Sequence, residues 1–296
     1  MTIHQALQQQ IAQFPPAGRQ LLTQIVTAPS FAGVIPAAQA QSLTIQMAIS
    51  NEELMHLLVP VARCYAYAPI SNYHVGTVVR GTSGNLYLGG NLEFPGLSLN
   101  QTVHGEQAAV VNARLQGETG LNALAVNGTP CGHCRQFLAE INNPHLLIIS
   151  PKGGHKELGQ VLPNAFMPQA LGNQQGLLDP VAPQLHATLE SDDPLTQAAL
   201  QMALQSYAPY SKNWSGLAVQ LANGLIIAAP YLESVAFNPT LSPLQNALVA
   251  LRLRQHDWQD IETAVLVEQA SLSSQEPMTR AMLATLGDVK LHYHTL

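Results

Sequence analysis

His104-Gly105-Glu106 and Pro130-Cys131-Gly132-His133-Cys134 are the two parts of a motif that extends over a helix, a strand and a second helix. Apolar residues recur with a helical period over 104–115, a short apolar run covers 124–127, and a helical pattern returns over 131–141. Each part of the motif therefore stands at the start of a predicted helix. A helix, a buried strand and a further helix in this order are typical of an α/β layer.

The segments on both sides extend the same layer. Asn51-Glu52-Glu53 opens a predicted helix, which Ser50 or Asn51 can cap and which ends near residues 67–69. Further strands are predicted over 75–81, 86–88 and 146–149. The resulting order of elements predicts a sheet with helices packed on it.

Composition divides the chain into four predicted regions. Residues 1–48 contain short helices broken by Pro and Gly, and residues 49–168 contain the motif. Residues 169–193 are rich in Pro, Gly and Gln with weak periodicity, which is typical of a linker. Residues 194–296 form a second predicted domain.

The second domain repeats the first at an offset of 140 residues. Tyr67-Ala68-Pro69 recurs as Tyr207-Ala208-Pro209, and the apolar strand 124–126 corresponds to 264–266. A gapless match over a long stretch indicates duplication of one α/β unit.

The second copy lacks every residue of the motif. At the same offset the positions of His104, Glu106, Cys131 and Cys134 are occupied by Leu244, Asn246, Ser271 and Ser274. We therefore expect one metal site per chain and a second copy that serves as scaffold and interface.

Bulk composition excludes several classes of protein. The net charge of −6, with 12 Lys and Arg among 296 residues, argues against a nucleic-acid partner. No apolar run approaches the roughly 18 residues of a membrane span. Three cysteines do not form a disulfide framework, and the N-terminus shows no secretory signal, so a cytoplasmic protein is expected.

The motif combines three metal ligands with one spare carboxylate. Cys131 and Cys134 are three residues apart at a helix start, where both sulfurs share one face and the free N–H groups favour thiolates. His104 at the other helix start adds a nitrogen ligand. Three protein ligands leave the fourth position of a tetrahedral zinc for water, as in catalytic rather than structural sites. Glu106 is then free to transfer protons, typically worth about 10²–10⁴-fold in rate.

Two alternatives remain open at this point. Cys131-Gly132-His133-Cys134 matches the dithiol sequence of thiol–disulfide oxidoreductases, although Pro130 precedes it where Trp is usual. The cysteine pair could also belong to a structural zinc module for assembly, with His133 or His145 as a further ligand.

The whole pattern resembles the cytidine deaminases, and in particular their long, homodimeric bacterial form. The resemblance implies a duplicated three-layer α/β/α fold with a small helical N-terminal region. It assigns the zinc ligands to His104, Cys131 and Cys134, and the proton shuttle to Glu106. The implied reaction is attack of zinc-bound hydroxide on C4 of cytidine or deoxycytidine, giving uridine or deoxyuridine and ammonia. A related zinc deaminase that acts on another nucleoside or base is the nearest alternative.

The resemblance also implies residues that bind the nucleoside. Asn91-Leu92-Glu93 matches an Asn-x-Glu that holds the ribose hydroxyl, which requires both a donor and an acceptor. Tyr73 stands where an aromatic ring, usually Phe, covers the pyrimidine. Phe166 matches a segment that a partner subunit lends to the site.

Overall fold

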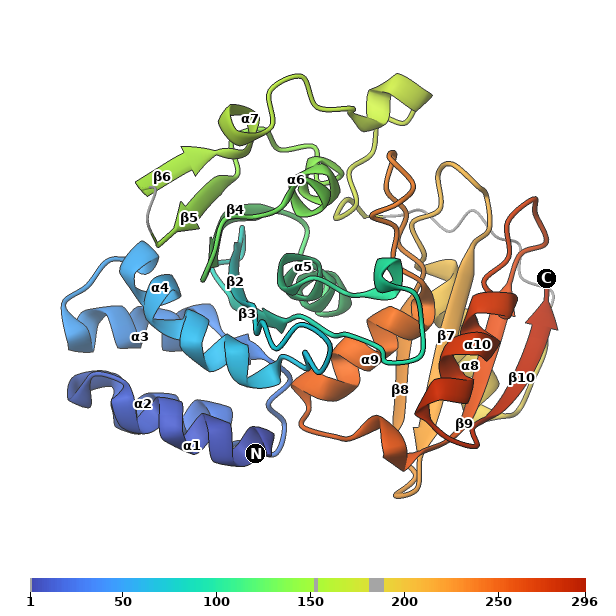
Figure 1. Ribbon diagram of the computed structural model, residues 1–296, viewed down its shortest axis with the longest axis horizontal. Coiled ribbons are helices and arrows are strands. Elements are labelled where there is room, and N and C mark those ends of the chain that lie inside the picture. Colours follow the sequence, from blue (N-terminus) through green and yellow to red (C-terminus); the bar gives the residue numbers. More distant parts are fainter. Residues whose placement is uncertain (1, 152–153, 181–188) are drawn as a thin grey trace.

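The computed structural model describes residues 2–151, 154–180 and 189–296. In this part of the chain two sheets are flanked by helices, one sheet in each half of the molecule (Figure 1). The predicted duplicated α/β fold is confirmed. No helix in these ranges is long and apolar enough to cross a membrane.

The first sheet has six strands in the order β1-β3-β2-β4-β5-β6. Only the β4–β5 pair is parallel, and all other neighbours are antiparallel. The strands are β1 Val34–Ile35, β2 Gly76–Gly81, β3 Leu86–Gly90, β4 Leu121–Val126, β5 Leu147–Ser150 and β6 Gly154–Glu157.

The second sheet repeats the central part of the first. Its order is β10-β9-β7-β8, with a parallel β9–β10 pair and antiparallel pairs elsewhere. The register shifts between Arg80 and Gly81 in the first sheet and between Gln220 and Leu221 in the second. The strands are β7 Ser215–Leu221, β8 Ile226–Pro230, β9 Ile261–Glu268 and β10 Lys290–Thr295.

Helices cover both faces of the first sheet. An added Cβ on Gly89 would lie 2.2 Å from the Ala109 nitrogen, whereas one on Gly90 would lie 2.6 Å from the Ala66 nitrogen. Successive residues of a strand face opposite sides of the sheet. Therefore α5 lies on one face, and Ala66, shortly after the end of α4, lies on the other. The helices of the first half are α1 Ile3–Gln13, α2 Pro16–Val26, α3 Ala37–Met47, α4 Asn51–Ala62, α5 Gly105–Leu115, α6 Gly132–Ala139 and α7 Leu158–Val161.

The two halves meet along α5 and α9, which pack against each other in the centre of the molecule (Figure 1). Gly105 to Ala113 is buried throughout, because α5 lies between its own sheet and the second half. The helices of the second half are α8 Pro194–Leu204, α9 Pro243–Leu253 and α10 Glu276–Leu286.

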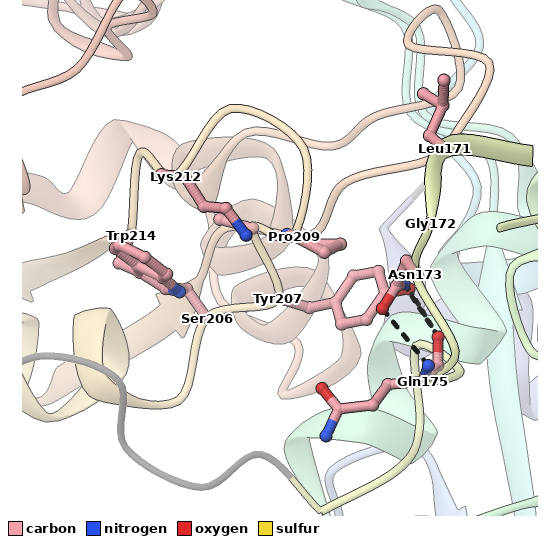
Figure 2. A pocket seen from close by; sticks show the side chains of 10 residues that line it. Leu171, Gly172, Asn173, Gln175, Ser206, Tyr207, Pro209, Lys212 and Trp214 are labelled. Carbon is pink, nitrogen blue, oxygen red and sulfur yellow. Dashed lines mark hydrogen bonds between the residues drawn. The ribbon is translucent and has the colours of Figure 1, made fainter. Parts of the chain in front are cut away.

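The N-terminal region and the predicted linker pack against the domains beside them more closely than their composition suggests. The N-terminal region is not purely helical, since β1 pairs with the edge of the first sheet through β3. In the predicted linker, Leu177 and Leu178 are fully buried, and Asn173 and Gln175 contact the hydroxyl of Tyr207 at 2.6 and 3.0 Å (Figure 2). Its segment 181–188 lies outside the described residues.

The constant offset of 140 residues is wrong over two helices. His104 is the N-cap of α5 and Ser242 is the N-cap of α9, an offset of 138, because the segment after β8 is two residues shorter than its counterpart after β3. Glu106 therefore corresponds to Leu244. Cys131 is the N-cap of α6, and the corresponding N-cap of α10 is Gln275.

At the corrected positions, too, the second copy lacks the residues of the motif. Among the described residues the structure brings together one potential metal-holding group of His, Cys, Asp and Glu side chains, and it lies in the first copy. The four structural counterparts of the motif are Ser242, Leu244, Gln275 and Met278.

Candidate metal centre and substrate pocket

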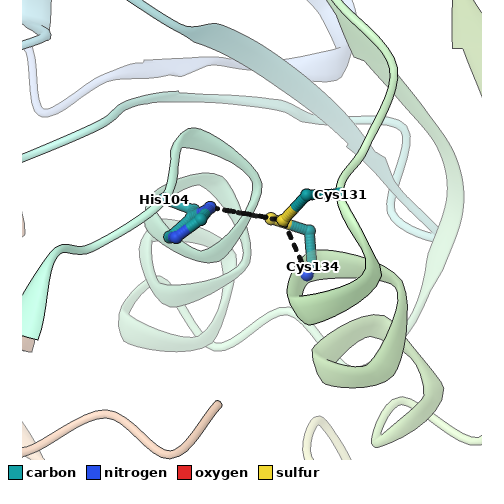
Figure 3. Close-up of side chains that lie close together, drawn as sticks. All are labelled: His104, Cys131 and Cys134. Atoms are coloured by element: carbon teal, nitrogen blue, oxygen red, sulfur yellow. Dashed lines mark hydrogen bonds between the residues drawn. The ribbon is translucent and has the colours of Figure 1, made fainter. Parts of the chain in front are cut away.

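Two helix starts bring the motif together. His104 is the N-cap of α5 and Cys131 the N-cap of α6, whose first turn contains Cys134. The two helices are consecutive in the chain apart from β4 between them, so both N-termini face the same end of the sheet. In Figure 3 the His104 ring and the two sulfurs point toward one another.

The three donor atoms converge closely. Nδ1 of His104 lies 3.5 Å from Sγ of Cys131 and 3.3 Å from Sγ of Cys134, and the two sulfurs are 3.4 Å apart. The backbone N–H of Cys134 also points at Sγ of Cys131, at 3.4 Å.

This donor set fits zinc. Zinc–sulfur bonds of about 2.3 Å and zinc–nitrogen bonds of about 2.0–2.1 Å in a tetrahedron place neighbouring donors about 3.6–3.8 Å apart. The distances between the donor atoms are only a few tenths of an ångström shorter, so small side-chain shifts suffice. Two thiolates and one imidazole are ligands that zinc prefers.

His104, Cys131 and Cys134 shift one another's pKa values. A hydrogen bond from Cys134, together with the neighbouring His104, lowers the pKa of Cys131 to about 3. The same bond to Cys131, with burial, raises the pKa of Cys134. The bond to Cys131 raises the pKa of His104. These shifts favour a thiolate on Cys131 beside a protonated His104 ring, and the thiolate is the form of cysteine that binds a metal.

Glu106 lies in the second position of α5, with only 4% of its surface exposed. Burial raises the pKa of its carboxyl group. The residue lines the same pocket as His104 and Cys131. The chain therefore places an easily protonated carboxyl beside the metal ligands, as proton transfer requires.

The other histidines near the motif do not join the metal group. His133 stacks on the His104 ring, with centroids 4.7 Å apart at an angle of 25°. His145 pairs through Nδ1 with Glu157 at 3.0 Å. Within the described ranges neither histidine completes a four-ligand structural zinc site with the cysteine pair.

A pocket of about 290 Å³ opens beside the metal group. This volume is near the lower end of the roughly 300–1,000 Å³ typical of small-molecule sites. Three predicted residues, Asn91, Glu93 and Tyr73, line it, and Phe166 does not. The pocket is lined by Ser71, Tyr73, Val75, Asn91, Glu93, Thr102, His104, Gly105, Glu106, Val126, Gly128, Thr129 and Cys131.

Asn91 and Glu93 also hold the loop that precedes β2. Asn91 accepts the Val75 N–H at 2.8 Å and donates to the Tyr73 carbonyl at 3.0 Å. Glu93 accepts the Ile70 and Ser71 N–H groups at 2.7 and 3.0 Å and the Ser71 hydroxyl. Burial alone would raise the pKa of Glu93, but these hydrogen bonds lower it and keep the group ionised.

The second copy repeats this arrangement for Glu233, which accepts from Tyr210 and Ser211. Because the bonds recur where the motif is absent, the Glu93 contacts stabilise the loop whether or not a substrate is bound. Free acceptor and donor capacity remains on Glu93 and Asn91 for a ligand.

Phe166 is half-exposed, and its carbonyl accepts from Gln136 on α6 at 2.6 Å. Its ring is outside the pocket of its own chain. The expectation that it serves a partner's site stays a prediction.

The pocket also contains residues that the motif did not predict. Val75 starts a predicted strand and Thr102 belongs to a segment with no recognisable pattern, and their place in the pocket depends on packing between distant segments. Gly128 and Thr129 directly precede the Pro130-Cys131 part of the motif, and this proximity in sequence could have indicated them.

Gly128 leaves space that Tyr73 uses. A Cβ on residue 128 would lie 3.1 Å from the Tyr73 hydroxyl oxygen. We expect Gly128→Ala to lower kcat/KM by roughly tenfold, because overpacking of this kind costs about 1–3 kcal/mol. Tyr73→Phe removes the contact, so the double variant should recover to within about threefold of the wild-type protein. Steady-state kinetics of the two single variants and the double variant measure this; strictly additive losses would contradict the contact.

The duplicated α/β fold and its His/Cys/Cys centre define a zinc-dependent deaminase. Models of the cytidine and deoxycytidylate deaminase zinc-binding region match residues 48–149 and 158–280. The chain belongs to this family of hydrolytic enzymes. The second match covers a copy in which Ser242, Gln275 and Met278 replace the ligands.

Relatives match over nearly the whole chain. The cytidine deaminase of Aliivibrio fischeri is 41% identical and that of Vibrio cholerae 42% identical, each over 99% of both chains. The cytidine deaminase of Proteus mirabilis is 42% identical over 95% of this chain and 96% of its own. Among solved structures, the cytidine deaminase of Mycobacterium leprae covers 39% of this chain and 99% of its own, at 30% identity and a TM-score of 0.37.

Proposed function

We propose that this chain hydrolyses cytidine and deoxycytidine to uridine and deoxyuridine with release of ammonia. The observation that carries the proposal is the buried carboxyl of Glu106 beside a converging nitrogen and two sulfurs, in a pocket suited to a small ligand. The relatives that match over almost their full length are cytidine deaminases.

His104, Cys131 and Cys134 would hold the zinc ion. Zinc, when bound, lowers the pKa of water toward neutrality and makes it a nucleophile. Glu106 accepts a proton from the attacking water and delivers it to the ring nitrogen of the pyrimidine. The water oxygen bonds to C4, and Glu106 then takes the remaining proton of this oxygen and gives it to the amino group on C4. The bond between C4 and the amino group breaks as C4=O forms, and the amine leaves as ammonia. Burial favours this sequence because it raises the pKa of Glu106 and excludes competing water.

The residues that we propose to contact the substrate line the pocket. Asn91 and Glu93 would bind the ribose hydroxyl with the donor and acceptor capacity that their loop contacts leave free. Tyr73, which is 58% exposed, would cover the pyrimidine ring. A ring that lies open to solvent in the free protein gains buried area when a base packs against it.

The proposal is tested by metal analysis together with an ultraviolet assay on cytidine, deoxycytidine, adenosine and cytosine. We expect close to one zinc per chain and turnover of the first two substrates. Turnover of adenosine or cytosine in their place would favour a related deaminase. Zinc-free protein with insulin-reducing activity would overturn the proposal in favour of the dithiol interpretation.

We further propose that the chain forms a homodimer. Charged residues make up only 10% of the sequence, and several large apolar side chains are exposed, among them Ile70 and Tyr73 on the loop beside the pocket. A second copy covering this region would bury them, and Phe166 would then be available to a neighbouring site. Sedimentation equilibrium distinguishes a dimer from a single chain of 31.7 kDa. A cytoplasmic location stays a prediction from the sequence.

A further inference from the structure

We propose that the second copy positions the catalytic turn of the first through a single side chain, Gln107. The inference concerns a positioning residue and rests on the proposed function. Gln107 directly follows Glu106, and its side chain is fully buried at the contact between the two halves of the molecule. Its side chain does not line the pocket and hydrogen-bonds to backbone groups of His104 and Pro239, so its influence on the reaction passes through the residues that it holds.

One amide group joins the catalytic turn to the second copy. Oε1 of Gln107 accepts the backbone N–H of His104 at 3.0 Å. Nε2 of the same side chain donates to the carbonyl of Pro239 at 2.8 Å. The turn that carries His104 and Glu106 is thus joined by two hydrogen bonds to a residue 132 positions further along the chain.

Burial makes this link rigid. A buried amide that loses a partner costs about 1–3 kcal/mol, so the Gln107 side chain has few alternative arrangements. Its bond to His104 holds the N-cap residue in the extended conformation, with φ −79° and ψ 155°, from which the imidazole reaches the two sulfurs. Glu106 lies between His104 and Gln107, so its backbone is held from both sides.

Pro239 is itself held in place. It lies in the segment between β8 and α9, whose ends are joined by the antiparallel bridge between Leu232 and Leu241. Within this segment the Thr240 hydroxyl accepts the Ser234 N–H at 3.0 Å. This segment is two residues shorter than its counterpart in the first copy. The carbonyl group that accepts from Gln107 therefore belongs to a shortened loop.

The second copy contains an equivalent link that runs in the opposite direction. Oε1 of Gln245 accepts the Ser242 N–H at 2.8 Å, and its Nε2 donates to the Gln101 carbonyl at 2.7 Å. The chemistry is the same in both directions across the α5–α9 contact. Only the Gln107 link ends on a turn with metal-binding and proton-transferring side chains, because Ser242 and Leu244 replace His104 and Glu106 in the other copy.

The equivalent link through Gln245 supplies a matched control. Gln107→Glu keeps the acceptor for His104 but turns a carboxylate oxygen toward the Pro239 carbonyl, and Gln245→Glu makes the same change toward Gln101. Both variants should lose a similar amount of thermal stability. We expect Gln107→Glu to lower kcat by roughly 10–100-fold with KM changed less than about threefold, since small displacements of catalytic groups have effects of this size. The Gln245→Glu variant should stay within about threefold in kcat.

Zinc release gives a readout that needs no substrate. We expect a chromogenic chelator to remove zinc from Gln107→Glu at least about fivefold faster than from Gln245→Glu. Equal kcat and equal release rates in the two variants would overturn the proposal and leave both glutamines as plain interface contacts. If the wild-type protein holds zinc but does not deaminate cytidine, the proposed function fails, while the release rates still test Gln107.

A second pair of variants covers the case in which the buried carboxylate prevents folding. Gln107→Met and Gln245→Met remove both hydrogen bonds of each link without adding charge, and the volumes stay similar. The same ordering is expected: a larger loss of kcat and faster zinc release for the change at Gln107. An equal or reversed ordering would overturn the proposal.

Discussion

Glu106→Gln is expected to retain its zinc and to lose about 10²–10⁴-fold in kcat. The substitution keeps the shape of the side chain but removes the group that accepts and returns protons. The side chain is 4% exposed, so solvent water does not easily replace it. Because the proposed metal donors are His104, Cys131 and Cys134, the zinc content should remain close to one per chain.

Metal analysis and steady-state kinetics on the same preparation check this result. Glu157→Gln is a suitable control, since that carboxylate belongs to the same half of the chain but is half-exposed and pairs with His145. It should leave both zinc content and kcat unchanged within about twofold. Loss of zinc from Glu106→Gln would show that Glu106 is a ligand and not a proton shuttle.

Cys131→Ala is expected to lose both zinc and turnover. The variant removes one of three converging donors, and the remaining imidazole and thiol lack the ligand count of a catalytic zinc site. Cys131 is also the N-cap of α6, where its sulfur accepts the Cys134 N–H, so the local helix start loses a partner as well. The expected residual activity is below about 10⁻³ of the wild-type value.

Cys64→Ala is the matched control for this prediction. Burial raises the pKa of the Cys64 thiol to about 12, and the thiol donates a hydrogen bond to the Pro60 carbonyl at 3.5 Å. The variant should keep its zinc and its kcat. Zinc retained by Cys131→Ala, or two zinc ions per wild-type chain, would contradict the assignment of a single centre in the first copy.

Much of the fold could be predicted from the sequence because local residue patterns determine many of its helices and strands. Ser50 caps α4 as predicted, since its hydroxyl accepts the Glu53 N–H at 3.1 Å. The strands β2 and β3 and the helices α5 and α6 lie within a few residues of their predicted ranges. The duplication was visible because paired strands tolerate few insertions, so β2, β4, β7 and β9 keep the offset of 140.

The offset was wrong where the chain can change length without disturbing the sheet. The segment that leads into α9 is two residues shorter than the one that leads into α5, so the N-caps correspond at 138 and not at 140. β1 was missed for another reason: a strand of two residues has no period to detect. The burial of Leu177 and Leu178 was missed because a Pro- and Gly-rich segment resembles a linker even when part of it packs into the core.

The sequence by itself predicted the metal donors and the proton-transferring group. Two sulfurs three residues apart at a helix start share a face, and His104 with Glu106 starts the other helix, so local geometry alone restricts what these residues can do. Tertiary structure decided how the two helix starts meet and which walls enclose them. It also decided that Phe166 stays outside its own pocket and that Gln107 bonds to Pro239. Such contacts join segments that no local pattern relates, because they depend on loop lengths and on how two complete layers pack.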